Sequence, residues 1–189
     1  MKQDKYYIDR VLRGDVNAYG YLVEQHKGMI YTIALKMLKN AEDAEELAQD
    51  TFVKAFRSLK EFKFESKFST WLYRITYNGA ISKLRRSQME VSNIDDSVLP
   101  EEEVLSTYNG INELTKEEQK IYIKEAIQNL KEEDAFIITM YYLKENTIDE
   151  ISQMTGLTNA NVKVKLHRAR KRFYIELKLI LKDEVKTIL

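Results

Sequence analysis

The sequence predicts an all-α fold of two helical domains joined by an acidic linker. The chain of 189 residues has six glycines and one proline, which is little turn chemistry for a many-stranded sheet. Apolar residues recur at steps of three and four, the spacing of helices that bury one face. Charge is uneven, because residues 1–86 carry a net +5, residues 87–117 a net −7 and residues 118–189 a net +2.

The domain boundaries follow from the charge pattern. We predict a first domain at residues 1–86, a linker at 87–114 that contains Pro100, and a second domain at 115–189. The alternative is a long surface loop within one domain, but structureless loops of this length are uncommon. No apolar run approaches the roughly 20 residues of a membrane span, and no signal-type stretch follows Met1. We therefore expect a cytoplasmic protein.

Three helices are predicted in the first domain. Asp15 caps the first, whose inner face contains Leu22, Val23, Ile30, Ile33 and Met37 with Tyr19 and His26. Asn40 ends that helix or caps the second, which has acidic residues in its first turns. The buried stripe of the second helix consists of Ala44, Leu47, Ala48, Thr51, Phe52, Ala55, Phe56 and Leu59. The third begins near Ser66 or Ser69, with Phe68, Trp71, Leu72 and Ile75 inward.

The second domain shows the pattern of a helix-turn-helix. Thr115 with Glu118, and Thr147 with Glu150, have the spacing of capping boxes. The helix after Thr115 buries Ile123, Ile127 and Leu130, and the next carries Phe136, Ile137, Met140, Tyr141 and Leu143. Gly156 stops the short helix that begins at Thr147, and Thr158 caps a longer one with Val162 and Leu166 inward. A short helix, a glycine-containing turn and a second helix make up this motif.

The second helix of this motif is strongly basic and indicates DNA binding. Residues 163–172 include six Lys or Arg and no acid. The start of such a helix enters the major groove, so the candidates for base contact are Thr158, Asn159, Asn161, Val162 and Lys165. Lys163, Arg168, Arg170 and Lys171 are candidates for DNA contact farther along, the last three nearer the phosphates. A solvated basic face is the alternative, and the motif argues against it.

Aromatic and basic residues alternate between residues 60 and 86. Flat rings stack on unpaired bases and cations hold the backbone, so the mixture suits single-stranded nucleic acid. We assign Phe62, Phe68 and Trp71 to the core. Phe64, Tyr73 and Tyr77 lie off the predicted stripe and are the stacking candidates, with cations that include Lys67, Arg74, Arg85 and Arg86.

The residues do not favour an enzyme. His26 lies on an apolar stripe, and His167 lies in the basic helix without metal-ligand neighbours. Carboxylates fall at helix starts or in the linker, without a phosphate loop or nucleophile motif. We expect no catalytic residues, metal, cofactor or small-molecule substrate.

Three stretches make the chain resemble the extracytoplasmic-function sigma factors, small members of the sigma-70 family of bacterial RNA polymerase initiation subunits. They run from Asp43 to Phe56, from Phe68 to Arg86, and from Ile148 to Lys171. They are similar, in order, to the region 2 helix that docks on polymerase, the region 2 segment that opens and reads the minus-10 element, and the region 4 helix-turn-helix that reads the minus-35 element. Val164 and Lys165 stand where the family often has Ser and Arg, so the promoter sequence does not carry over.

The resemblance implies a non-catalytic protein whose partners are core RNA polymerase, promoter DNA and an anti-sigma factor, often membrane-anchored. It assigns polymerase binding to Asp43, Glu46, Leu47, Gln49, Asp50 and Val53. It assigns minus-10 DNA to Phe64, Lys67, Tyr73, Arg74, Tyr77, Asn78, Arg85 and Arg86. It assigns minus-35 DNA to the candidates on the basic helix named above.

A second function remains open on the sequence. A helix-turn-helix regulator whose first domain senses a ligand or dimerises has the same second domain, and a helical enzyme is a more distant alternative. The segment from Asp43 to Phe56 distinguishes a sigma factor from a ligand-sensing regulator. A ligand-sensing bundle does not need that acidic and apolar face, and it binds duplex DNA without polymerase.

Overall fold

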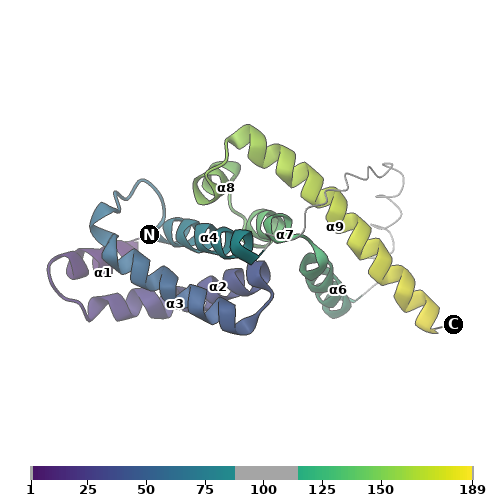
Figure 1. Cartoon of the computed structure of the whole chain (residues 1–189), viewed down its shortest axis with the longest axis horizontal. Coiled ribbons are helices and arrows are strands. Elements are labelled where there is room, and N and C mark those ends of the chain that lie inside the picture. Colours follow the sequence, from purple (N-terminus) through teal and green to yellow (C-terminus); the bar gives the residue numbers. More distant parts are fainter. Residues whose placement is uncertain (1, 88–114, 189) are drawn as a thin grey trace. The chain divides into compact units, whose positions relative to one another are not determined.

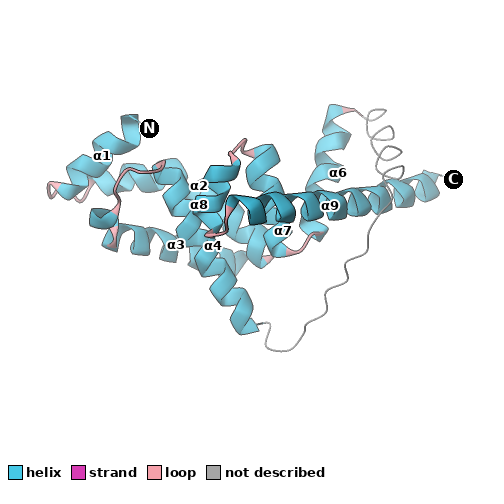
Figure 2. Ribbon diagram, turned by 90° about the horizontal axis from the view of Figure 1, so that it is seen from above, coloured by secondary structure: helices cyan, strands magenta, loops and turns pink. Residues whose placement is uncertain are grey.

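The computed structural model describes residues 2–87 and 115–188, and the side chains of residues 3–86 and 115–181. Every regular element in these ranges is a helix (Figure 2). The chain divides into two compact units, Met1–Val91 with Thr147–Thr158, and Ser92–Asn146 with Asn159–Leu189. Apart from Ser87, the predicted linker lies outside the described residues. The short segment around residues 147–158, which we predicted as part of the second domain, belongs to the first unit.

The first unit is a bundle built around one central helix. Its elements are α1 (Lys2–Leu12), α2 (Ala18–Leu38), α3 (Ala41–Arg57), the 3-10 turn η1 (Leu59–Glu61), α4 (Phe68–Ser87) and α8 (Ile148–Thr155). Helix α2 packs against α1, α3 and α4, and α4 also contacts α3 and α8 (Figure 1). The loop between η1 and α4 therefore leads directly into α4, which packs against α2, α3 and α8.

The core of this bundle follows the predicted stripes. Leu22, Ile30, Ile33 and Met37 of α2 are buried, as are most apolar residues predicted for α3. Helix α1 was not predicted, and among its described side chains Ile8 alone is fully buried.

One predicted cap is confirmed and another is wrong. The side chain of Asn40 accepts a hydrogen bond from the backbone N–H of Asp43 at 3.0 Å and caps α3. Asp15 does not cap α2, because Arg10 holds its carboxylate with bonds of 2.9 and 2.5 Å. This pairing raises the pKa of Arg10. Helix α2 instead begins at Ala18, after Asn17.

A glycine of α4 faces α3. A Cβ atom added to Gly79 would lie 2.5 Å from Cδ1 of Leu47, whose side chain is buried. In the same interface the hydroxyl oxygens of Thr51 and Thr76 lie 3.3 Å apart, and that of Thr76 donates to the carbonyl of Leu72 at 2.9 Å. A side chain at position 79 therefore competes with Leu47 for the same space.

The second unit contains α6 (Lys116–Asn129), α7 (Glu132–Ile138), the π-helical turn η2 (Thr139–Leu143) and α9 (Asn159–Ile188). Helix α9 packs against both α6 and α7. The core cluster consists of Ile127, Leu130, Ala135, Ile138 and Ala169, with Ile123, Leu166 and Phe173 packed against it. Tyr141 and Leu143, which we predicted on the same helix as Phe136, lie in the π-helical turn that follows α7, and both are exposed.

The predicted capping boxes and the glycine stop are confirmed. Thr115 and Glu118 exchange hydrogen bonds at the start of α6, and Thr147 and Glu150 do so at the start of α8. Gly156 ends α8 in the left-handed conformation with φ 74°. None of the helices that the structure describes combines the length and apolar character of a membrane span.

The contact at Gly79 predicts the sign of a stability change. Gly79→Ala forces Leu47 out of its packed rotamer, which costs about 1–3 kcal/mol and outweighs the helix propensity gain of about 1 kcal/mol. Gly28→Ala is the matched control, because its Cβ meets nothing within 4 Å on α2. Denaturant unfolding should show a lower free energy of unfolding for Gly79→Ala and a higher one for Gly28→Ala. Equal stabilisation by both changes would contradict this packing.

Candidate nucleic-acid interface

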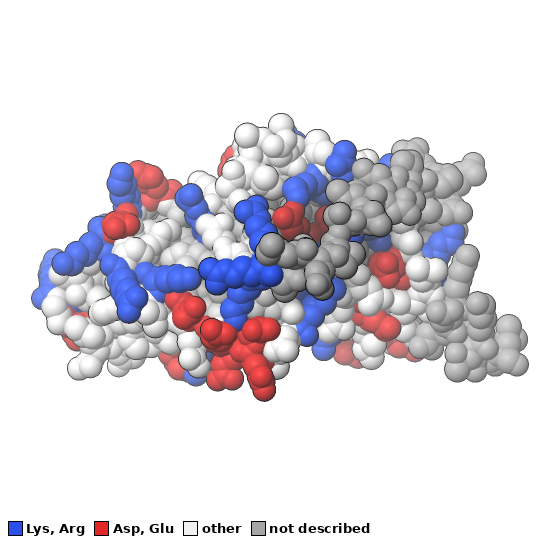
Figure 3. All heavy atoms as spheres, in the orientation of Figure 1, with Lys and Arg blue, Asp and Glu red and all other residues white. Residues whose placement is uncertain are grey.

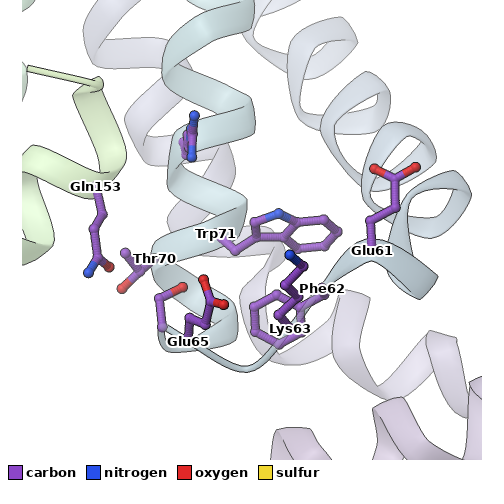
Figure 4. Close-up of a pocket in the computed structure, with 9 residues that line it drawn as sticks. Glu61, Phe62, Lys63, Glu65, Thr70, Trp71 and Gln153 are labelled. Atoms are coloured by element: carbon purple, nitrogen blue, oxygen red, sulfur yellow. The ribbon is translucent and has the colours of Figure 1, made fainter.

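A cavity of about 350 Å³ lies beside the start of α4 (Figure 4). The segment between η1 and α4, the first turns of α4 and one residue of α8 form its wall. The lining residues are Glu61, Phe62, Lys63, Glu65, Ser66, Thr70, Trp71, Arg74 and Gln153. Phe62 and Trp71 are the aromatic residues of this lining, and the other seven are polar or charged, including the carboxylates of Glu61 and Glu65.

Two aromatic rings form the apolar part of the cavity. The ring centroids of Phe62 and Trp71 lie 5.1 Å apart, with 36° between their planes. Phe62 is buried, whereas Trp71 is partly exposed where it lines the cavity. Figure 4 shows the indole of Trp71 above the ring of Phe62, with Lys63 beside them. Trp71, which we assigned to the core, thus packs on Phe62 and also has part of its surface in the cavity wall.

A buried hydroxyl without a partner lies in the cavity wall. Thr70 is 2% exposed, and its Oγ1 has no hydrogen-bond partner among the residues that the structure describes. The side chain of Gln153 extends toward Thr70 (Figure 4). Leaving such a group unpaired costs about 1–3 kcal/mol, so a hydrogen-bonding ligand in this cavity recovers free energy there.

Phe64 holds an exposed ring at the rim of this region. Its φ of 59° lies in the left-handed region, which is uncommon for a bulky residue. The ring is 39% exposed and its centroid lies 4.9 Å from that of Phe62. Backbone strain of this kind concentrates at functional sites. Phe64 thus keeps the accessible position that base stacking requires.

Two other stacking candidates are buried, contrary to the prediction that they lie off the core face. Tyr73 and Tyr77 are 9% and 6% exposed. Burial raises the pKa of the Tyr73 hydroxyl, and a hydrogen bond with Ser69 partly opposes this. Both rings fill the side of α4 that faces the bundle, so neither is available to an incoming base.

The predicted minus-10 cations differ in their present partners. Arg74 lines the cavity and is exposed. Asn78, Arg85 and Arg86, farther along α4, are also exposed but do not line the cavity. Lys67 is paired with Glu150 of α8, with 2.6 Å between Nζ and the carboxylate. This bond lowers the pKa of Glu150, and the backbone N–H of Thr147 adds to the effect. Figure 3 shows Lys and Arg side chains gathered along α4.

The exposed face of α3 is acidic and continues into an apolar hollow. Of the six residues assigned to polymerase binding, the exposed ones are Asp43, Glu46, Gln49, Asp50 and Val53. Leu47 is 3% exposed and was wrongly included, because it packs on Gly79. Lys83 of α4 contacts Asp43 at 3.1 Å and Glu46 at 2.5 Å. Its pKa is raised, mainly by the hydrogen bond with Glu46.

The apolar hollow lies at the end of the same face. It has a volume of about 580 Å³ and lies between the start of α2 and the end of α3. The residues around it are Val16, Asn17, Tyr19, Gly20, Phe52, Val53, Phe56 and Arg57. Phe56, which we placed on the buried stripe, is 39% exposed here. Its ring packs edge-on against Tyr19, whose hydroxyl donates to the carbonyl of Phe52 at 2.7 Å.

Most of the residues of the basic helix α9 that we predicted to contact DNA are exposed. Asn159, Asn161, Lys163, Arg168 and Arg170 are exposed, as is Thr158 before the helix, and Lys171 is partly exposed. Val162 is fully buried, so its assignment to base contact was wrong. Lys165 is half-buried and forms an ion pair with Glu133 of α7. Arg172 bonds to Asp134 at 2.6 Å.

Sequence reasoning missed the cavity residues Thr70, Lys63 and Glu65. A threonine inside a helix carries no sequence signal that separates a satisfied hydroxyl from an unpaired one. Lys63 belongs to the aromatic and basic alternation that we recognised, but its place in a cavity wall follows from the fold.

Two family models match the chain. The model of sigma-70 region 2 matches residues 22–89, and that of sigma-70 region 4 matches residues 120–173. The first match contains the cavity segment and the α3 face, and the second contains the helix-turn-helix segment.

Similar proteins match over nearly their full length. The ECF RNA polymerase sigma factor SigW of Bacillus subtilis is 30% identical over 86% of this chain and 90% of that protein. The RNA polymerase sigma-H factor of Pseudomonas aeruginosa is 26% identical over 96% of this chain and 97% of that protein. The sigma factor RpoE of Bartonella quintana, solved in complex with the anti-sigma factor NepR, has a TM-score of 0.60 at 19% identity and covers 85% of this chain and 96% of its own.

The ion pair at the cavity predicts a shift in one carboxyl titration. In Lys67→Gln the pKa of Glu150 should rise toward its ordinary value, since the largest cause of its depression is gone. Glu118 is the matched control, because its pKa is lowered by Thr115 alone and should not move. Carboxyl-carbon NMR titration of the full chain measures both.

The same pair sets a pH dependence of stability. The folded-state pKa of Glu150 is depressed, so its contribution is present above the unfolded pKa and is lost as the pH falls through the folded one. The stability difference between wild type and Lys67→Gln should therefore shrink in acid. A Glu150 pKa that is the same in both proteins would show that the pair does not form in solution.

Proposed function

This chain belongs to the extracytoplasmic-function group of the sigma-70 family, and we propose that its two family regions divide promoter recognition between the cavity beside α4 and the start of α9. As an RNA polymerase sigma factor, it directs promoter-specific transcription initiation. We propose that it acts in the cytoplasm. We also propose that it has no catalytic activity of its own, because DNA binding and polymerase docking account for the surfaces described above.

The cavity beside α4 accepts an unstacked base of the minus-10 element. The observation that carries this proposal is the buried, unpaired hydroxyl of Thr70 in the wall of the cavity that Phe62 and Trp71 also line. An extruded base needs flat apolar walls and hydrogen-bond partners for its edge. Arg74 and Lys63 supply cations for the adjacent phosphates, and Phe64 offers a ring to the neighbouring base.

Lys67 contributes to the same strand by exchanging partners. Its ammonium group is held by Glu150 in this structure. A DNA phosphate that replaces this carboxylate gives Lys67 an equivalent charge-assisted bond. Arg85 and Arg86, exposed at the far end of α4, extend the basic surface for the backbone.

Core polymerase docks on the exposed face of α3. The combination that supports this is an acidic row, including Glu46 and Asp50, that continues into the apolar hollow beside Val53 and Phe56. A partner helix with basic residues and one apolar anchor is complementary to such a face. An anti-sigma factor is proposed as a further partner, because RpoE of Bartonella quintana was solved with one.

The start of α9 reads the minus-35 element. Asn159 and Asn161 are exposed there and carry the amide groups that bond bidentately to adenine. Lys163, Arg168, Arg170 and Lys171 are proposed to contact the phosphates, and Lys165 is proposed to reach a base edge by leaving its ion pair with Glu133. A regulator with a ligand-sensing first domain finds no comparable support, since the family matches cover both units.

The cavity predicts separate effects on folding and on promoter opening. Thr70→Val should leave stability unchanged or raise it, because it removes an unpaired buried hydroxyl. With core polymerase it should reduce open-complex formation on duplex promoters, and Thr32→Val, whose exposed hydroxyl bonds its own helix, should not. Permanganate footprinting and thermal unfolding measure the two effects. Full opening activity in Thr70→Val would contradict the base site.

A stacking role for Phe64 predicts rescue by pre-melted DNA. Phe64→Ala should remove about 1–3 kcal/mol of stacking on the open strand. Open-complex formation should fall on linear duplex promoters and recover in part on a template with an unpaired minus-10 bubble. Equal defects on both templates would assign Phe64 to folding.

The two kinds of contact on α9 predict different DNA-binding defects. Arg168→Ala should weaken binding about equally for all minus-35 sequences and lower the salt slope by about one, as expected for a lost phosphate contact. Asn161→Ala should cost about 1–3 kcal/mol at one base position and leave nonspecific affinity nearly unchanged. Titration of the polymerase complex against a randomised minus-35 library at two salt concentrations separates them. Wild-type base preferences in Asn161→Ala would contradict its reading role.

A further inference from the structure

An exposed aromatic and basic surface covers α1 and the start of α2, outside the residues assigned above. We call it the α1 aromatic surface, and its members are Lys5, Tyr6, Tyr7, Arg10 and Tyr21. Tyr6 and Tyr21 are each 57% exposed, the largest exposure of any aromatic side chain among the described residues. Rings with this much exposed surface indicate a binding surface, because they leave flat apolar area in contact with water.

The rings of this surface are ordered by contacts with one another. Tyr7 stacks on Tyr21 with 4.7 Å between centroids and 14° between planes, and Tyr6 packs edge-on against Tyr7 at 5.2 Å. The guanidinium of Arg10 lies 5.7 Å from the ring centroid of Tyr6. The outer rings of Tyr6 and Tyr21 are therefore held in place with much of their surface accessible.

The surface is continuous with the rim of the α4 cavity. The ammonium of Lys5 lies 5.5 Å from the ring centroid of Phe64. Phe64 in turn contacts Phe62, which lines the cavity. Flat rings and cations thus follow one another from the cavity over Phe64 to α1 and on to Tyr21.

We propose that the unpaired DNA strand that places one base in the α4 cavity continues over the α1 aromatic surface, where Tyr6 and Tyr21 stack further bases. The inference rests on the proposed minus-10 site, since the cavity fixes where the strand begins. Rings alternating with cations form the usual platform for single strands, and stacking tolerates any base. The surface therefore adds affinity for the open strand without adding a sequence requirement.

The charges around this surface are compatible with a DNA backbone. Asp15 is held by Arg10 at 2.9 Å, and Asp4 lies 3.2 Å from the ring nitrogen of His26, so both carboxylates have partners. Asp9 is partly exposed on the same helix, and Glu24 of α2 pairs with Lys27 at 2.7 Å. Tyrosine and arginine also mark protein interfaces. Continuity with the cavity favours nucleic acid over a protein partner here.

The test compares short and long single strands on the complex of this chain with core polymerase. Fluorescence anisotropy is measured with a trinucleotide that spans the cavity and with a ten-nucleotide strand of the minus-10 region. Tyr6→Ala with Tyr21→Ala should weaken binding of the long strand about fivefold or more, the lower end of one lost stacking contact. Binding of the trinucleotide should not change. The double Phe variant at these positions should bind both strands as the wild type does.

Two control variants identify which part fails. Tyr31→Ala removes another exposed tyrosine of α2 and should leave both affinities unchanged. Thr70→Val should weaken both strands, and if it weakens neither, the cavity proposal itself fails. If Thr70→Val acts but the tyrosine double variant binds the long strand normally, the cavity stands and the α1 strand path is overturned. A double variant that loses polymerase binding while keeping DNA affinity would identify a protein interface and overturn the path as well.

Discussion

The close packing of α3 against α4 at Gly79 and Leu47 determines how the first unit presents its surfaces. Because Gly79 lacks a side chain, α4 lies near enough to α3 for Thr51 and Thr76 to meet in the interface. This contact fixes the rotation of α4 about its axis. Tyr73 and Tyr77 then face the bundle, whereas Trp71 and Arg74 line the cavity.

The same rotation connects the two binding surfaces of the unit. It brings Lys83 of α4 against Asp43 and Glu46 of α3, so the acidic face carries a cation from the helix that also forms the cavity. A partner that engages those carboxylates therefore competes with Lys83 for them.

Ion pairs hold two of the proposed DNA-binding cations in this structure. Lys67 is bonded to Glu150, and Lys165 to Glu133. Each carboxylate limits the conformations of a long side chain, which lowers the entropy lost when a phosphate takes its place. Thr70 shows the opposite arrangement, because its buried hydroxyl has no hydrogen-bond partner among the described residues. The site combines cations with exchangeable partners and one hydroxyl that has none.

The sequence by itself determined most of the helices, several of their caps and the basic face of α9. Capping boxes at Thr115 and Thr147, and the glycine stop at Gly156, depend on residues within a few positions of one another, so local chemistry decides them. Helical spacing likewise located the buried residues of α2, such as Ile30 and Met37.

Only the tertiary structure decided which neighbours meet across helices. Spacing along α4 does not fix how far the helix turns toward α3, so Tyr73 and Tyr77 were predicted off the core face although both are buried. The contact between Lys5 of α1 and the ring of Phe64 joins segments more than fifty residues apart. No local sequence pattern predicts this contact, and none predicted α1. Periodicity gives the faces of a helix, and packing against distant side chains gives the direction in which each face points.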